Sequence, residues 1–293
     1  MTSIADSDDL PAAPSRARRL GRILRRHRSL TIGGAMVLLL VLAGLLAPLL
    51  ATHDPTQQSL ATALRPPSAE HFFGTDQYGR DLYSRIVYGA RLSLLEIVLG
   101  VGIALVVGIP LGLLAGYSGG RVDQVIIWFM DILFAFPGIV LSILIVSILG
   151  TSLVNLMIGI AIFSIPVYGR LSRNLALALK QVEYTEAARA LGAGLWRILL
   201  QHILRNALGP IIVQATLTAG TVVLTAASLS FLGLGAQPPT PEWGAMMSDG
   251  RNFLGVNIWL SLFPGLAITF SVLGFNLLGD GLRDILDPRS NRG

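Results

Sequence analysis

Apolar residues gather into long runs that short polar stretches separate. The first run covers residues 29–50, with no Asp, Glu, Lys or Arg between Arg28 and Asp54. At about 1.5 Å per residue, a helix of this length spans roughly 33 Å, enough to cross the hydrocarbon core of a membrane. Five further runs have the same character, at residues 92–117, 124–150, 153–169, 206–235 and 259–279. The pattern predicts six membrane-spanning helices. The boundary between 124–150 and 153–169 has the weakest signal, because few polar residues separate these two runs.

The composition agrees with a membrane protein. Of 293 residues, 53% are hydrophobic and only 13% are charged, about half the charged share of a typical soluble domain. So few charges cannot cover the surface of a globule of this size. A soluble enzyme or a nucleic-acid-binding protein therefore does not fit, despite a net charge of +5. Cysteine is absent, which excludes disulfides, thiolate metal sites and cysteine nucleophiles.

The basic residues are distributed unevenly between the two sides of the membrane. With six spans, 17 of the 22 basic residues fall on the side that holds both termini and residues 170–205. The positive-inside rule places that side in the cytoplasm of a multi-pass protein of the cell membrane. The arginines of residues 1–28 directly precede the first span, so we expect them to contact anionic lipid rather than nucleic acid. The first span is expected to be a retained anchor, since it is too long for a signal peptide.

These patterns divide the chain into a few parts. We expect a basic cytoplasmic tail at 1–28, a first transmembrane anchor helix at 29–51, an extracytoplasmic segment at 52–91, a five-helix core at 92–280 that includes the cytoplasmic loop 170–205, and a cytoplasmic tail at 281–293.

Segment 52–91 contains four carboxylates and four arginines, which predicts a folded cap with local ion pairs and with turns at its Gly and Asp residues. After Asp81, apolar residues recur with helical period, which predicts an amphipathic helix that runs into the second span. His53 and His71 lie near acidic residues. No pair of candidate ligands has the spacing of a zinc motif, so we expect no metal site.

The second extracytoplasmic segment covers residues 236–258. Pro238, Pro239 and Pro241 restrict the backbone, so this loop should be stiff rather than a flexible lid. Trp243 is expected to anchor the loop at the membrane interface. A gate, or a contact for a partner protein, is the alternative.

Loop 170–205 is long for a protein with so little polar surface. Its residues predict two helical pieces that break at Gly192-Ala193-Gly194, where glycines permit a sharp turn. The side chains of Ala187 and Ala188 are small enough for another protein to approach closely. Glu186 and Arg189 supply charges at the edge of that surface. This pattern predicts a docking element for a soluble partner, and the alternative is a pair of helices that lies on lipid.

Several motifs resemble one family. Glu186-Ala187-Ala188, followed by Gly192 and then His202-Ile203-Leu204, resembles the "EAA" loop of permease subunits in bacterial ABC importers. Further segments resemble the dipeptide/oligopeptide/nickel branch, and in particular its second, C-type permease, as in dipeptide and glutathione importers. These segments are Phe73-Gly74-Thr75-Asp76, Gly79-Arg80-Asp81, Asp131 with Ala135-Phe136-Pro137, Ser228–Gly235, Pro238–Gly244 and Asn276–Pro288. One departure is Arg205, which stands where the family usually has Pro and puts the end of the second loop helix in question.

The resemblance implies an all-α fold of six transmembrane helices with a type I, methionine-permease-like core and no catalytic activity of its own. It implies a heterodimer with a second homologous permease, cytosolic ATPase subunits and an extracytoplasmic substrate-binding protein. The element that couples to the ATPase would consist of Glu186, Ala187, Ala188, Arg189, Gly192, Ala193 and Gly194. The chain lacks a phosphate-binding Gly-Lys-Ser/Thr loop, so ATP must be bound by a partner, and no cofactor is expected. Dipeptides or oligopeptides are the implied cargo, with glutathione, a nickel chelate or another small solute as alternatives.

Polar residues in the fifth predicted span are candidates for the translocation path. Spacings of 4, 3, 4 and 3 place them on one helical face, and they are Gln214, Thr218, Thr221, Thr225 and Ser228. We expect this polar stripe to line the path between two permeases. The alternative is that its side chains bond to their own helix or hold helices together.

Two carboxylates lie within or beside apolar spans, where ionisable residues are candidates for function. We expect Glu96 to be solvated or paired with Arg91. Asp131 is expected to form an ion pair with loop 170–205 rather than to contact substrate.

Two other classes of membrane protein fit the sequence less well. A secondary transporter often shows inverted repeats and ionisable residues near the midplane, and a membrane-embedded enzyme needs a nucleophile or metal constellation within its spans. The sequence shows neither pattern, and the importer permease is favoured.

Overall fold

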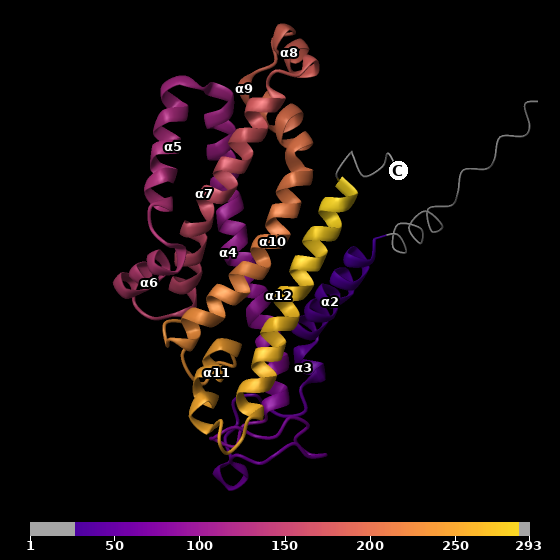
Figure 1. The fold of residues 1–293 in the computed structure, drawn as a ribbon, viewed down its shortest axis with the longest axis vertical. Coiled ribbons are helices and arrows are strands. Elements are labelled where there is room, and N and C mark those ends of the chain that lie inside the picture. The colour runs from indigo at the N-terminus through magenta and orange to yellow at the C-terminus, as the bar shows by residue number, and fades with distance from the viewer. Residues whose placement is uncertain (1–26, 287–293) are drawn as a thin grey trace, which may run out of the picture.

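The computed structural model describes residues 27–286 (Figure 1). Within that range the chain is helical, apart from turns, loops and an isolated bridge between Thr75 and Asp81. Nearly all of the predicted tail 1–28, and the end of the predicted tail 281–293, lie outside the described residues. The all-α prediction is confirmed for the described part of the chain.

The helices follow one another along the chain with short connections. They are α2 (Arg28–Leu45), α3 (Ala47–Leu50), the 3-10 turn η1 (Leu60–Thr62), α4 (Leu82–Ser118), α5 (Gly120–Phe134), α6 (Gly138–Leu149), α7 (Leu153–Leu179), α8 (Glu183–Ala190), α9 (Leu195–Arg197), the π-helical segment η2 (Ile198–Leu204), α10 (Arg205–Phe231), α11 (Trp243–Gly250), the 3-10 turn η3 (Arg251–Phe253) and α12 (Trp259–Leu286).

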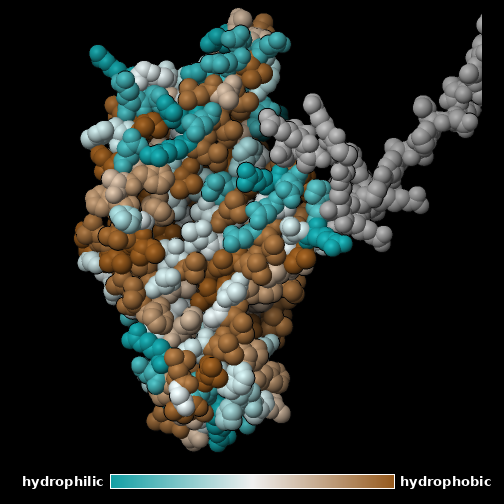
Figure 2. Space-filling model, viewed as in Figure 1, coloured by the Kyte–Doolittle hydropathy of each residue, from teal (hydrophilic) through white to brown (hydrophobic). Residues whose placement is uncertain are grey.

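Among the described helices, five are long and apolar enough to cross a membrane, and the bent pair α5–α6 is a sixth if it counts as one span. The long helices run side by side between two ends of the molecule, with α8 at one end and α11 at the other (Figure 1). Figure 2 shows hydrophobic residues over the middle of the visible face and hydrophilic residues gathered around the α8 end. The number and the apolar character of the predicted spans are confirmed, with α5–α6 taken together.

The predicted span 124–150 is a bent pair of helices rather than one continuous helix. The chain bends by 87° between α5 and α6. Pro137 sits at the N-cap of α6, and a residue that precedes proline is disfavoured in the α conformation, so the helix stops at this point. The predicted turn after α6 is present, since Gly150 ends α6 and the Ser152 hydroxyl caps α7 by accepting from the Asn155 N–H at 3.1 Å.

Long helices extend into both ends of the segment 170–205. Helix α7 continues to Leu179, and residues 195–231 form one unbroken helical stretch through α9, η2 and α10. Arg205, at the position where proline was expected, begins α10 directly after η2 and does not interrupt the helix. Within the segment 170–205, only residues 180–194 therefore lie outside the long helices.

Helices α4 and α7 share the most extensive contact between two of the described elements, and α4 carries glycines where the two backbones meet. A Cβ at Gly112 would overlap the backbone oxygen of Gly169 and the hydroxyl of Ser172. Gly108 and Gly116, four residues away on either side, likewise meet backbone oxygens of α7. Small residues at i and i+4 let membrane helices approach closely, which gains dispersion contacts without a hydrophobic driving force.

Helix α2 packs mainly against α12, so the first and last spans lie together. Gly33 meets the backbone of α12 at Leu277 and Leu278, and Gly281 meets the backbone of α2 at Leu30. Gly274 lies against Met36 in the same interface. The predicted anchor helix is therefore bound to the helical core along its length.

Residues 52–81 fold into the predicted cap at the α11 end (Figure 1). Asp76 binds the buried guanidinium of Arg80 at 2.6 Å and also lies 3.6 Å from Arg85. The Asp81 side chain accepts from the Ser84 N–H at 2.8 Å and caps α4. The local ion pairs and the helix that runs from Asp81 into the second span are both confirmed.

The glycine contact between α4 and α7 yields a first prediction. Gly112→Val should lower the free energy of unfolding by about 3 kcal/mol, the upper end of the usual cost of overpacking, because the new side chain meets backbone that cannot move away. Thermal unfolding of the purified chain in detergent measures the effect. Gly102→Val is the matched control on the same helix, because nothing lies within 4 Å of a Cβ there. Equal melting temperatures for the two variants would show that the close approach does not matter.

Candidate functional site

Helix α8 projects past the ends of the long helices (Figure 1). Its C-terminus is fixed by backbone bonds, from the Gly192 N–H to the Arg189 oxygen and from the Ala193 N–H to the Ala188 oxygen, each 3.0 Å. Gly192 has φ +81°, the left-handed conformation that glycine adopts at little cost. These bonds form a Schellman motif, which ends a helix with a defined turn. The predicted break at Gly192 is confirmed, and its geometry is stiff.

The outer surface of α8 is exposed and combines small apolar side chains with charged ones. Ala187 is exposed, and Leu191 at the tip is 88% exposed. The side chains of Glu186 and Arg189 lie 3.8 Å apart on the surface. Such a surface presents an apolar contact with charges at its edge, and it suits a groove on another protein.

The residues next to α8 pack against the helical core. Thr185 is buried, and in η2 the residues Ile198, Leu199 and Ile203 are each at most 1% exposed. They pack with Leu113 of α4 and Ala176 of α7 in a separate apolar cluster (residues 113, 176, 198, 199 and 203). This cluster joins the helical segment that follows α8 to α4 and α7.

Two ion pairs join α5 to α7 near the same end. Arg170 lies 2.5 Å from Asp131, which confirms the predicted pair between Asp131 and loop 170–205 as the sequence analysis bounded it. Arg173 binds Asp123 through two bonds of 2.5 and 2.6 Å. The second pair was missed because Asp123 lies at the start of α5, in a short polar segment that carried no motif.

The polar stripe of α10 is only partly exposed. Thr218 is buried and accepts from the Gln214 amide at 3.2 Å. The Thr221 hydroxyl bonds to the Leu217 oxygen at 3.4 Å, and the Ser228 hydroxyl to the Leu224 oxygen at 2.7 Å. At the two exposed positions of the stripe, the hydroxyl therefore bonds to a backbone oxygen of its own helix. The sequence analysis left this alternative open. The part of the stripe that faces out of this chain consists of Thr221 and Ser228.

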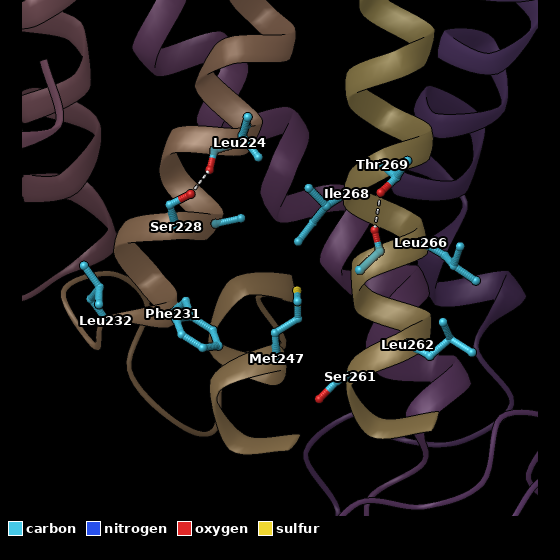
Figure 3. Close-up of a pocket in the computed structure, with 12 residues that line it drawn as sticks. Leu224, Ser228, Phe231, Leu232, Met247, Ser261, Leu262, Leu266, Ile268 and Thr269 are labelled. Carbon is cyan, nitrogen blue, oxygen red and sulfur yellow. Dashed lines mark hydrogen bonds between the residues drawn. The ribbon is translucent and has the colours of Figure 1, made fainter. Parts of the chain in front are cut away.

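A cavity of about 740 Å³ opens beside the end of the stripe, between α10, α11 and α12 (Figure 3). Its wall is mostly apolar, with the hydroxyls of Ser228, Ser261 and Thr269 as polar groups, and the Thr269 hydroxyl bonds to the Gly265 oxygen at 2.8 Å. The lining residues are Leu224, Ala227, Ser228, Phe231, Leu232, Met247, Ser261, Leu262, Gly265, Leu266, Ile268 and Thr269. Of these, the sequence analysis named only Ser228 as a path residue, because the other lining residues of α10 are apolar and those of α11 and α12 come from segments with no polar periodicity.

Glu96 is not where the sequence placed it. It is 1% exposed, Arg91 points to the exterior, and the Glu96 Oε1 atom has no hydrogen-bond partner among residues 27–286. The expectation of a solvated or Arg91-paired carboxylate is wrong. The other buried carboxylate near it is that of Glu242. Burial is the largest influence on the pKa of Glu242 and raises it, against two backbone N–H bonds of 2.8 Å that lower it.

Trp243 is also placed differently from the prediction. It is 2% exposed, its Nε1 donates to the Ile86 oxygen at 3.0 Å, and its ring fills the space left by the missing side chain of Gly89. The prediction that Trp243 anchors the loop at the membrane interface is therefore wrong. The tryptophan instead locks the loop before α11 onto α4, which is consistent with a stiff loop.

This arrangement, a bundle of helices long and apolar enough to cross a membrane, with one short exposed helix at an end and no strand within residues 27–286, is that of an integral membrane protein. Residues 108–292 match the family described as "Binding-protein-dependent transport system inner membrane component", and residues 15–67 match the "N-terminal TM domain of oligopeptide transport permease C". The chain belongs to the first of these families, the permease subunits of binding-protein-dependent ABC importers.

Curated relatives match over most of their length. The dipeptide transport system permease protein DppC of Alkalihalophilus pseudofirmus is 48% identical, over 96% of this chain and 93% of the relative. The probable D,D-dipeptide transport system permease protein DdpC of Escherichia coli is 48% identical, over 89% of this chain and 88% of the relative. The glutathione transport system permease protein GsiD of Pectobacterium atrosepticum is 46% identical, over 92% and 89%. The resemblance stated from the motifs is confirmed.

Among solved structures, the fold is similar to a chain of the MetNI methionine ABC transporter in an inward-facing conformation. The TM-score is 0.56 at 20% identity, and the match covers 69% of this chain and 97% of the other. At this identity the match supports the fold alone, and it confirms the methionine-permease-like core.

The Schellman turn yields a second prediction. Gly192→Ala should destabilise the end of α8 by about 1–2 kcal/mol, because a Cβ is disfavoured in the left-handed conformation. Amide hydrogen exchange at residues 192 and 193 should then speed up by roughly 5- to 30-fold. Gly194→Ala is the control, since Gly194 has φ −68° and nothing lies within 4 Å of a Cβ there. Unchanged exchange in Gly192→Ala would mean that the turn is not held in this conformation.

Proposed function

We propose that this chain is one of two permease subunits of an ATP-driven importer of dipeptides, oligopeptides or peptide-like solutes. The observation that carries the proposal is the exposed, stiffly mounted helix α8, which a permease needs in order to couple to a motor protein. The cargo class is supported by relatives that are named for dipeptide, D,D-dipeptide and glutathione transport.

In this proposal, residues 186–194 dock into a groove on a cytosolic ATPase subunit. The Schellman turn and the packed base make α8 a rigid lever, because its backbone bonds and side-chain contacts leave few ways to deform. Closure of the ATPase subunits on ATP then moves α8, and the apolar cluster at its base passes the displacement to α4 and α7.

Hydrolysis of ATP is assigned to those separate subunits. The chain has no Gly-Lys-Ser/Thr phosphate loop, and its single lysine, Lys180, donates to the Gly116 oxygen at 2.9 Å, where it links the ends of α7 and α4. A substrate-binding protein outside the membrane would deliver the cargo to the end that carries the cap and α11. This orientation places both termini in the cytoplasm and follows from the excess of basic residues on the α8 side.

The translocation path is proposed at the interface with a second, homologous permease. The exposed residues of the polar stripe, Thr221 and Ser228, would contribute hydroxyls to that path, and the adjacent cavity would accept apolar parts of the cargo. Peptides carry many amide donors and acceptors. Neutral hydroxyls along the path can form hydrogen bonds with these groups without binding the peptide strongly. The alternative cargo, glutathione, fits the same chemistry, since it is a peptide.

The coupling role leads to a third prediction. Glu186→Lys should reduce the ATPase subunit that co-purifies with the permease by at least about tenfold, because it places a second positive charge beside Arg189 at the docking edge. Pull-down of the assembled importer, quantified by mass spectrometry, measures the loss. Asp280→Lys provides the control, since it reverses an exposed charge on α12 outside α8. ATPase binding that is unaffected by Glu186→Lys would contradict docking at α8.

The path leads to a fourth prediction. Thr221→Val should lower the rate of peptide uptake by about fivefold, the effect of roughly one net hydrogen bond, while leaving the amount of assembled importer unchanged. Uptake of a labelled dipeptide into proteoliposomes measures the rate. Thr216→Val removes a hydroxyl that also bonds within α10, to Ile212, but lies off the stripe. Equal uptake by the wild type and Thr221→Val would remove the stripe from the path.

A further inference from the structure

The cap brings together three side chains that are potential metal ligands. His53 follows the end of α3, whereas Glu70 and His71 precede α4, so the sequence separates them by up to 18 residues. In the structure their ligand atoms lie within 4.8 Å of one another. The two imidazole centroids are 4.7 Å apart, with the rings inclined by 35°. The group borders a small cavity of about 170 Å³, which Asp54 and Asp81 also line.

Hydrogen bonds hold both imidazoles from one side. The buried His71 has its Nδ1 atom 2.9 Å from Asp81 Oδ1. The Nδ1 atom of His53 lies 3.0 Å from the Thr52 hydroxyl and 3.8 Å from the same Asp81 oxygen. The Nε2 atom of each ring therefore remains for another ligand. A carboxylate that binds the second nitrogen of a metal-ligating histidine fixes the tautomer and the ring orientation.

Asp81 is itself held firmly. Its other oxygen, Oδ2, accepts from the Ser84 N–H at 2.8 Å as the N-cap of α4, and Asp81 is 2% exposed. The orienting group is therefore part of the start of a 37-residue helix. A histidine pair positioned by a buried, helix-bound carboxylate is more ordered than surface histidines usually are.

We propose that His53, Glu70 and His71 bind a divalent transition-metal ion, with Zn²⁺ as the best match, through two imidazole nitrogens and one carboxylate. Two histidines and one carboxylate are a frequent zinc ligand set, and they leave the fourth tetrahedral position for water or a donor from a bound molecule. Imidazole ligands favour Zn²⁺ and its neighbours over Mg²⁺ and Ca²⁺.

The geometry needs only a small adjustment to bind the ion. Metal–ligand bonds of about 2.0–2.1 Å place tetrahedral ligand atoms about 3.3 Å apart. The candidate ligand atoms, which lie within 4.8 Å of one another, must therefore move closer together to bind an ion. Glu70 is exposed and the His53 side chain is 36% exposed, so rotation about their side-chain bonds supplies this movement. Asp54 lines the same cavity and adds a further carboxylate beside the three proposed ligands.

The bound ion would tie the end of the α2–α3 segment to the loop that enters α4. The present links between these parts include bonds from the Thr52 and His53 N–H groups to the Ser84 hydroxyl, at 3.2 and 3.1 Å. The spacing of the three ligands in the sequence matches no zinc motif, because they come from both ends of one folded segment. This inference does not depend on the proposed transport function.

Co²⁺ is the probe for the experiment, because its tetrahedral complexes absorb visible light. The full-length chain, purified in detergent without a histidine tag, is titrated with Co²⁺ and then with Zn²⁺. We expect one Co²⁺ per chain with a tetrahedral spectrum, and loss of that spectrum as Zn²⁺ displaces it. Glu70→Gln and His53→Gln should each weaken binding by at least tenfold, and Asp81→Asn by roughly 10- to 100-fold.

His27→Gln is the matched control, since it removes a histidine at the other end of α2. The test relies on His53 and Glu70 rather than on the buried His71, because replacing more exposed side chains leaves the cap folded. Zn²⁺ should also raise the melting temperature of the wild type and of His27→Gln but not that of His53→Gln. An absent tetrahedral spectrum, or equal affinity in the wild type, Glu70→Gln and His53→Gln, would overturn the proposal and leave a hydrogen-bonded histidine pair without a metal.

Discussion

The backbone contact between α4 and α7 is the constraint on which the rest of the structure depends. Helix α4 has 37 residues and is therefore about 55 Å long. At one end Asp81 starts it within the cap, and at the other its Leu113 supports the base of α8. Because glycines bring α7 against its backbone, neither helix can shift without separating that interface. The cap, the core and the exposed helix are thus held in one frame by residues that have no side chains.

Long-range apolar pattern and local turn chemistry made much of this fold predictable. The six apolar runs, the break at Gly192 and the helix that starts at Asp81 all follow from residues close in sequence. The failures concern features that depend on distant partners. The bend at Pro137 could have been inferred from the proline itself, but the burial of Trp243 depends on Gly89, more than 150 residues earlier. The same limit hid the clustering of His53 with His71.

The functional surfaces differ in how far the sequence could define them. The docking face of α8 is local, since one short helix and its turn supply it, and a motif could therefore identify it. The polar stripe was also local, but its exposure was not, because Thr218 is buried against the helices around α10 while Thr221 is exposed. Burial of the carboxylate pair Glu96 and Glu242 depends on two separate segments that meet. Periodicity can select a helical face, and tertiary packing decides what that face meets.

The pairing of α2 with α12 has a consequence for biosynthesis. A chain made from its N-terminus inserts α2 first and α12 last, so the principal partner of the first helix does not exist until synthesis is almost complete. During that interval the glycine face of α2 is exposed to lipid, and its smaller contact with α4, at Gly44, is the earlier one to form. Closure of the bundle by α12 is therefore the final step of assembly, and shortened chains that stop before α12 lack the contact that joins the two ends of the fold.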